Sequence, residues 1–363
     1  MPLKDIIQRE IKEIAPLKLS RFMDLCLMHP EFGYYRQASP IGAKGDFITS
    51  PEISQLFGEM LGVFFMDLWA RSGTPLEFNF IEFGPGKGTL LQDLLRVFNK
   101  NSTMRTGAHI FLLESNAYLE KEQREKLSTI STACQWYSKL SDLINNLSPY
   151  PTFFIGNEFL DVFPIDQYIF QENRWCERRI AYDDQSDSFV FKNFFLSASI
   201  HDIPFPSSPI PGTVMEISES QENFLLELLS GLKGLPYSGV FIDYGYTQGT
   251  GNSFQSVSNH AFVNPLENLG FQDLTAHVNF NRLSSILTQN LTPTPNIFGP
   301  ISQGMFLRNL GIETRADRLI SKNPERKSQI KKDLNRLTSM DEMGTLFKVL
   351  GITNHSSLIL AGF

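Results

Sequence analysis

The chain has 363 residues, which is enough for one large domain with insertions or for two domains. Hydrophobic residues make up 42% of the chain and charged residues 20%, so it can bury a substantial core. The formal net charge of −7 argues against non-specific nucleic-acid binding, which requires a basic surface.

The first 75 residues predict an N-terminal helical segment. Isoleucines at helical spacing predict a helix over residues 3–15, and a second helix is expected over residues 20–29 with Ser20 as its N-cap. A third helix should follow Ser50 as its N-cap, because Pro51 suits the first helical position and Glu52 the first turn.

A polar loop, residues 45–49, precedes that third helix. Packing does not explain its Gly-Asp-Phe-Ile-Thr sequence. We expect the loop either to cover a cofactor, with Asp46 in contact with it, or to serve only as a capping loop for the helix. The sequence favours neither reading.

The chain is organised around a glycine-rich turn between a strand and a helix. Residues 78–83 form a short apolar run, and residues 89–98 carry apolar side chains at helical spacing. Glycines allow a tight turn and a close backbone approach to a ligand, and the helix after them offers unpaired N–H groups. The residues expected to bind the cofactor at this turn are Glu82, Gly84, Gly86, Gly88 and Thr89.

The type of turn narrows the choice of ligand. The sequence Gly-Pro-Gly-Lys-Gly matches neither the dinucleotide fingerprint G-x-G-x-x-G nor a P-loop, in which Ser or Thr follows Gly-Lys. Glu82 would repel a pyrophosphate but can hold an ammonium group. This combination favours S-adenosyl-L-methionine (SAM), which has a cationic amino acid end and no phosphate.

A second strand, residues 109–114, ends in another acid, Glu114. A doubly wound fold places the carboxylate that binds ribose hydroxyls at this point. The alternative is that Glu114 only favours the N-terminus of the helix that starts at Asn116.

Two further strands of the predicted core also end in acids. One covers residues 152–158, and the other covers residues 239–245. Because ligands bind at the carboxyl ends of strands in open α/β sheets, these acids should surround the cofactor. The side chains concerned are Asn157, expected at the cofactor, and Glu158, Asp161 and Asp243, expected to be catalytic.

Acids suit methyl transfer to a basic nitrogen. A guanidinium stays protonated and is a poor nucleophile, but a carboxylate can bind it at two points and aim one nitrogen at the methyl group. The alternative for Glu158 and Asp161 is that they cap the start of a helix.

Two insertions interrupt the predicted α/β doubly wound, Rossmann-like domain of residues 76–363. The first, residues 165–213, is β-rich, with strands over 165–170, 175–182 and 188–194, and the core sheet should resume at residue 214. The second, residues 246–340, starts with a long loop up to residue 272 and continues with helices over 282–289, 303–310 and 324–337. Residues 345–351 and 357–362 should close the sheet as an antiparallel pair.

The composition also makes some sites and locations unlikely. The three cysteines are scattered, no C-x-x-C pair occurs, and the six histidines lack metal-ligand spacing, so neither disulfides nor a metal site are predicted. No run approaches a membrane span, and the first residues resemble neither a signal peptide nor a transit segment. We therefore expect a cytoplasmic protein.

Nearly the whole chain resembles the MidA family of class I SAM-dependent methyltransferases, whose mitochondrial members assist the assembly of respiratory complex I. The resemblance rests on the glycine turn with its flanking acids and on several other motifs. These are His29-Pro30 with Gly33-Tyr34-Tyr35, residues 45–52, Asn157-Glu158-Phe159 with Asp161 and Pro164, residues 242–246, residues 273–278, Gln303 with Phe306-Leu307, and Met343-Gly344.

The resemblance implies symmetric ω-N dimethylation of an arginine in a complex I core subunit, with SAM as cofactor and a protein as partner. Two alternatives stay open: a protein that binds SAM without catalysis and acts as an assembly factor, and a nucleotide-dependent oxidoreductase, which Glu82 and the glycine spacing disfavour. The sequence leaves the oligomeric state open, with a homodimer as one option.

Overall fold

A computed structural model describes residues 2–36, 49–128, 133–196, 203, 205–248, 250–258 and 261–363. Asp46 and the predicted cofactor-covering loop up to residue 48 lie outside the described residues.

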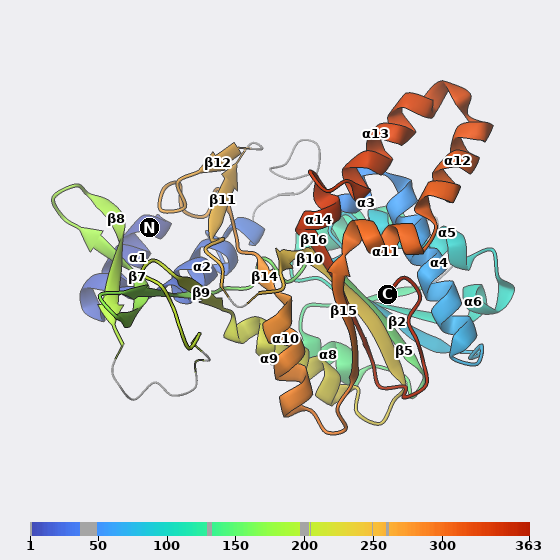
Figure 1. The fold of residues 1–363 in the computed structure, drawn as a ribbon, viewed down its shortest axis with the longest axis horizontal. Coiled ribbons are helices and arrows are strands. Elements are labelled where there is room, and N and C mark those ends of the chain that lie inside the picture. The colour runs from blue at the N-terminus through green and yellow to red at the C-terminus, as the bar shows by residue number, and fades with distance from the viewer. Residues whose placement is uncertain are drawn as a thin grey trace.

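The core is an eight-stranded mixed sheet with the order β15-β16-β10-β5-β2-β3-β4, in which β14 also pairs with β10 (Figure 1). Its strands are β2 (Phe78–Phe83), β3 (Ala108–Leu113), β4 (Cys134–Tyr137), β5 (Thr152–Asn157), β10 (Tyr237–Tyr246), β14 (Val278–Asn279), β15 (Asn296–Ser302) and β16 (Phe347–Thr353). The strands β10, β5, β2, β3 and β4 are all parallel. From β2 the chain adds β3 and β4 on one side of β2, and it then returns to add β5 and β10 on the other side. The order therefore reverses between β2 and β5, and this is where doubly wound folds bind ligands.

Both faces of this sheet are covered by helices. Every residue of β2 and β5 is buried, as expected for central parallel strands. On one face, Phe78 and Phe80 pack with α4 (Gln55–Arg71) and α5 (Thr89–Phe98). On the other face, Ile81 and Phe83 pack with residues of α8 (Leu140–Asn145), α9 (Glu219–Gly231) and α10 (Phe280–Asn290). The predicted α/β doubly wound class is confirmed.

A second, antiparallel sheet lies beside the core and has the order β1-β7-β6-β9, with β8 paired to β7. Its strands are β1 (Leu17–Lys18), β6 (Asp166–Gln171), β7 (Arg174–Asp183), β8 (Ser188–Phe195) and β9 (Val214–Ile217). The three predicted strands of the insertion are confirmed. The expected return to the core at residue 214 is wrong, because β9 pairs with β6.

This second sheet packs against the N-terminal helices α1 (Leu3–Glu13) and α2 (Leu19–Met28) through a shared apolar cluster. The predicted N-cap role of Ser20 is wrong, since Lys18 precedes the helix. The Ser20 N–H instead donates to Asp166 Oδ1 at 3.0 Å, which ties α2 to β6.

The helix predicted after Ser50 is in fact two helices, and the predicted N-cap role of Ser50 is wrong, because Thr49 holds that position. α3 (Ser50–Ile53) ends at Ser54, whose extended backbone (φ −159°) separates it from α4. The Ser54 side chain then caps α4 by accepting from the Leu56 N–H. The apolar periodicity runs through both helices and so hides the break.

The C-terminal third departs most from the predictions. The long loop expected up to residue 272 contains β11 (Gln255–Ser258) and β12 (Ala261–Val263), which form a small sheet with β13 (Asp273–Thr275). β16 pairs with β10 and β15, so the predicted partner at residues 357–362 is wrong. The pairing register shifts between Phe298 and Ile301 in β15, and this irregularity breaks the alternation that would have marked a strand.

The remaining elements connect these layers. They are η1 (Tyr34–Arg36), α6 (Ser102–Gly107), α7 (Ala117–Leu127), α11 (Gln303–Asn309), α12 (Ile312–Lys322), η2 (Pro324–Arg326), α13 (Lys327–Thr338) and α14 (Met343–Leu346). The helix α12 was not predicted.

Candidate cofactor and active site

The glycine turn begins directly after β2 and needs its glycines. Gly84, Gly86 and Gly88 all have positive φ angles, of 60°, 54° and 73°. A Cβ built on Gly84 would lie 2.8 Å from the Phe159 ring. Side chains other than glycine are therefore strained at these positions, and the backbone stays open on its ligand side.

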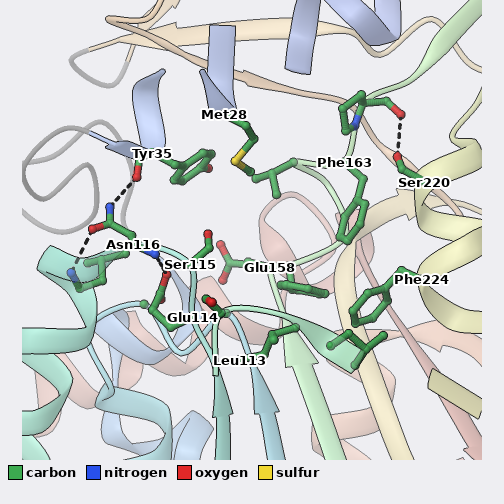
Figure 2. Close-up of a pocket in the computed structure, with 18 of the residues that line it drawn as sticks. Met28, Tyr35, Leu113, Glu114, Ser115, Asn116, Glu158, Phe163, Ser220 and Phe224 are labelled. Carbon is green, nitrogen blue, oxygen red and sulfur yellow. Dashed lines mark hydrogen bonds between the residues drawn. The ribbon is translucent and has the colours of Figure 1, made fainter. Parts of the chain in front are cut away.

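A cavity of about 450 Å³ opens above this turn at the sheet's switch point (Figure 2). Gly84, Gly86 and Glu114 line it at the ends of β2 and β3, while Met28 and Tyr35 reach it from the N-terminal segment. On the side away from Tyr35, Phe163 of the segment after β5 and Phe224 of α9 close the cavity, and Phe159 also lines it.

Glu114 lies on the cavity wall, and hydrogen bonds fix its carboxylate. It accepts from the Asn116 N–H at 2.7 Å and from Gln123 Nε2 at 3.0 Å. Burial raises the pKa of Glu114, and these hydrogen bonds oppose that shift. Asn116, and not Glu114, caps α7, because its side chain accepts from the N–H groups of the first turn. The position of Glu114 suits binding of ribose hydroxyls.

A smaller cavity of about 50 Å³ lies against the same glycine turn and is lined by Glu82, Asn157 and Thr89, among others. Among the described residues, Glu82 Oε2 and Asn157 Oδ1 are buried without a hydrogen-bond partner. Burial raises the pKa of Glu82 to about 8. Two buried acceptors without a donor match what an ammonium group needs, so the residues present fit the amino acid end of SAM.

The Thr89 side chain ties three elements together at this smaller cavity. Its hydroxyl donates to Glu52 Oε1 of α3 and accepts from Lys126 Nζ of α7 at 2.6 Å. Gly88, in contrast, lines neither cavity and occupies the N-cap position of α5.

Glu158 borders both cavities. Its backbone has φ +51°, and its N–H donates to the Ile242 carbonyl at 2.9 Å. Its Oε1 accepts from the Ser50 N–H at 2.7 Å and from Asn157 Nδ2 at 3.2 Å. Burial raises the pKa of Glu158 to about 7, the Ser50 hydrogen bond lowers it, and the nearby charge of Asp161 raises it further. At neutral pH this carboxyl group can therefore be present in either form.

Asp161 and Asp243 lie close to Glu158 but line neither cavity. Asp243 Oδ2 accepts from the N–H groups of Phe159, Leu160 and Asp161 at 3.1, 2.8 and 3.2 Å. This carboxylate holds the turn that follows β5. Burial raises the pKa of Asp243 well above its usual value, and the charge of Asp161 adds to the shift.

Asp161 in turn accepts a hydrogen bond from the Tyr244 hydroxyl. Burial raises the pKa of Asp161 to about 6, against the lowering effect of that bond. The three predicted catalytic acids are thus brought together, but only Glu158 is accessible from the cavities.

Tyr35, for which the sequence indicated no individual role, forms part of the cavity roof. Its carbonyl accepts from Asn116 Nδ2 at 2.8 Å (Figure 2), and its hydroxyl donates to the Asp273 carboxylate at 3.1 Å. The aromatic cluster around Tyr35 was visible in the sequence, but its position over the cavity depends on tertiary packing.

Among the described residues, no cluster of His, Cys, Asp and Glu side chains could hold a metal ion. No helix in that part of the chain has both the length and the apolar character needed to cross a membrane.

Residues 60–297 match a family described as S-adenosyl-L-methionine-dependent methyltransferases. The chain is 32% identical to the protein arginine methyltransferase NDUFAF7 homolog, mitochondrial, of Caenorhabditis elegans, over 95% of this chain and 85% of the relative. It is 29% identical to the protein arginine methyltransferase NDUFAF7, mitochondrial, of Xenopus laevis, over 96% of this chain and 84% of the relative.

Among solved structures, a superfamily member from Burkholderia thailandensis bound to S-adenosyl-homocysteine superimposes with a TM-score of 0.82. It is 25% identical, and the match covers 99% of this chain and 94% of that one. The match extends over both sheets and the N-terminal helices, and so includes every element that lines the cavities.

One expectation from the sequence needs correction. The curated relatives are named as mitochondrial proteins, which contradicts the expected cytoplasmic location. That expectation relied on the absence of a recognisable targeting segment, which was an inadequate basis for it.

Proposed function

The chain belongs to the family of S-adenosyl-L-methionine-dependent methyltransferases, and we propose that it methylates ω-nitrogens of arginine in a protein substrate. SAM is its cofactor, and the enzyme is of class I. The observation that carries the arginine assignment is the position of Glu158, a carboxyl group at the junction of the two cavities.

Each cofactor-binding role is assigned to a residue of the two cavities. Glu82 and Asn157 would hold the ammonium group, and Glu114 the ribose hydroxyls. The glycine turn would follow the methionine portion closely, because its positive-φ glycines leave space there. When bound, SAM supplies an electrophilic methyl group on a sulfonium.

Glu158 would hold the acceptor guanidinium. A carboxylate localises the positive charge of a guanidinium and orients one nitrogen, and this positioning is the enzyme's main contribution to the transfer. The ionised form is required, and a bound cation would favour ionisation of a group whose pKa is about 7. In this proposal Asp161 and Asp243 assist through Glu158, because they lie behind it and outside the cavities.

Aromatic and apolar side chains would accommodate the rest of the arginine. Met28, Phe159 and Phe163 line the large cavity near Glu158. They can pack along the methylene stem while the charged head reaches the carboxylate.

We further propose symmetric dimethylation and a core subunit of respiratory complex I as the substrate. Support comes from the resemblance of the motifs to the MidA family and from relatives named as protein arginine methyltransferases. The division into an N-terminal segment of residues 1–75 and a methyltransferase domain of residues 76–363 remains part of this proposal, as does a homodimer.

The test uses the full chain with methyl-labelled SAM and separated complex I subunits. Mass spectrometry of the labelled protein should find symmetric dimethylarginine. Transfer to lysine or to a small molecule would refute the arginine assignment. Tight SAM binding without transfer to any of these subunits would favour an assembly factor that binds SAM without catalysis.

A further inference from the structure

The second sheet has an exposed edge at the β7–β8 hairpin, at the end of the molecule away from the core sheet (Figure 1). Among the described strands, β8 pairs only with β7, so its other edge has no strand partner. Residues 191–195 of this edge strand expose Phe191 by 37%, Phe194 by 39% and Phe195 by 42%. An apolar unpaired edge favours pairing with another chain unless it is blocked.

Both faces of β8 carry exposed phenylalanine rings here, because alternate side chains of a strand point in opposite directions. Phe191 and Phe195 lie on one face and Phe194 on the other. An added strand could therefore contact aromatic rings above and below the sheet as well as the free backbone edge.

Cations accompany each of the three rings. The guanidinium carbons of Arg174, Arg178 and Arg179 lie 3.8, 5.2 and 5.9 Å from the ring centroids of Phe195, Phe191 and Phe194. We refer to these six residues together with Lys192 as the β8 patch.

The β8 patch is locally basic although the chain carries a net charge of −7. Within the described ranges, Arg174 and Lys192 form no salt bridge, and Arg179 pairs with Glu177 at 2.5 Å. Arg178 donates to Gln167 Oε1 at 2.7 Å on β6, which lies on the opposite side of β7 from β8, so its guanidinium is not free for a partner at the edge. At the other end of β8, Asp184 and Asp187 of the hairpin turn pair with Lys12 and Lys4. Asp183 accepts from the Ser186 hydroxyl at 2.7 Å and also interacts with the charge of Lys192. Unpaired positive charge beside exposed rings favours an acidic partner.

A second copy of this chain is a poor occupant. Antiparallel pairing of two β8 edges would bring Lys192 of both copies to one seam, and like charges opposite one another in a sheet are destabilising.

We propose that the β8 patch binds an extended segment of another protein, in which acidic and apolar residues alternate, as an added strand beside β8. The segment's carboxylates would meet Arg174 and Lys192, and its apolar residues would cover the phenylalanine rings. This interaction is separate from methyl transfer, so it does not depend on which residue the enzyme methylates.

The test measures binding of two fluorescein-labelled peptides to the full chain by fluorescence anisotropy. One peptide alternates Glu and Val, and the other alternates Lys and Val. The acidic peptide should bind, with an affinity that falls as salt is added, and the basic peptide should not. The double variant Arg174→Glu, Lys192→Glu should weaken binding of the acidic peptide by about tenfold or more.

The matched control is Lys331→Glu, Lys332→Glu, which makes the same change of charge on the exposed face of α13. It should bind the acidic peptide like wild type, and both double variants should keep wild-type SAM affinity as evidence of folding. Equal loss in the two double variants, no loss in either, or equal binding of both peptides would overturn the proposal. So would sedimentation of wild type as a dimer that Arg174→Glu, Lys192→Glu dissociates, since a second copy would then occupy the edge.

Discussion

Replacing Glu158 with Gln removes a charge and keeps the shape of the side chain. In the wild-type protein the Ser50 N–H donates to Glu158 Oε1 at 2.7 Å. The amide oxygen of glutamine can accept the same hydrogen bond, so α3 should stay in contact with residue 158. The guanidinium would lose a charge-assisted hydrogen bond, which contributes roughly 1.5–3 kcal/mol. At about 1.4 kcal/mol per tenfold change, that corresponds to roughly 10- to 150-fold, and the loss of orientation should bring the rate down by about 10²-fold or more.

Two measurements separate binding from transfer. Calorimetry should give nearly the same SAM affinity for wild type and Glu158→Gln, because Glu82, Asn157 and Glu114 bind the cofactor in this interpretation. Methyl transfer to an arginine peptide should fall. The wild-type rate should also rise with pH through about 7, as Glu158 ionises, and the variant should lack this rise.

Asp24→Asn is the control, since Asp24 also lines the large cavity and the exchange of acid for amide is the same. If SAM affinity and transfer fall together in Glu158→Gln, then Glu158 serves the cofactor or the fold. If neither changes, the acceptor is held elsewhere, and Glu158 acts only as an anchor for the Ser50 N–H at the start of α3.

Three further changes test the rest of the site. Gly86→Val should abolish SAM binding, because φ at this position is +54° and a branched side chain would occupy ligand space; calorimetry showing unaltered affinity in a folded variant would contradict this. The pKa of Glu82 in the folded protein is about 8, raised from 4.5, so this group adds to the free energy of unfolding at low pH, and its contribution is lost as pH rises through about 8. Glu82→Gln should make the free energy of unfolding less dependent on pH over this range. Denaturant titrations of the cofactor-free protein at several pH values would measure this. Asp243→Asn should lower stability by about 1–3 kcal/mol, read as a drop in the denaturation midpoint, and an unchanged midpoint would remove the anchoring role of Asp243.

The sequence predicted the core of the fold because local signals and the final packing agree there. β2, β5 and β10 are rich in apolar residues and buried along almost their whole length, as central parallel strands are, and each was located to within a few residues. β15 was missed because its register shift interrupts the alternation, and β9 was assigned to the wrong sheet because pairing between distant strands leaves no local mark.

The candidate site was predictable where it depends on strand ends. Acids at the ends of parallel strands must converge, and Glu82, Glu114 and Glu158 do lie around the two cavities. The sequence could not distinguish the role of Glu158 from that of Asp243, since both are acids at or near strand ends. Their difference depends on which backbone N–H groups each carboxylate meets after folding.

That difference suggests how the two acids act together. The strained backbone of Glu158, with φ +51°, is held by its own N–H bond to the Ile242 carbonyl of β10. The next residue of β10, Asp243, holds the three N–H groups that follow Glu158. The direction of the Glu158 side chain is therefore set by β10 as much as by the end of β5. In this view Asp243 is a positioning residue, so Asp243→Asn should impair the acceptor step through displacement of Glu158 while SAM affinity stays close to wild type. A loss of SAM affinity equal to the loss of transfer would show that the turn serves the cofactor instead.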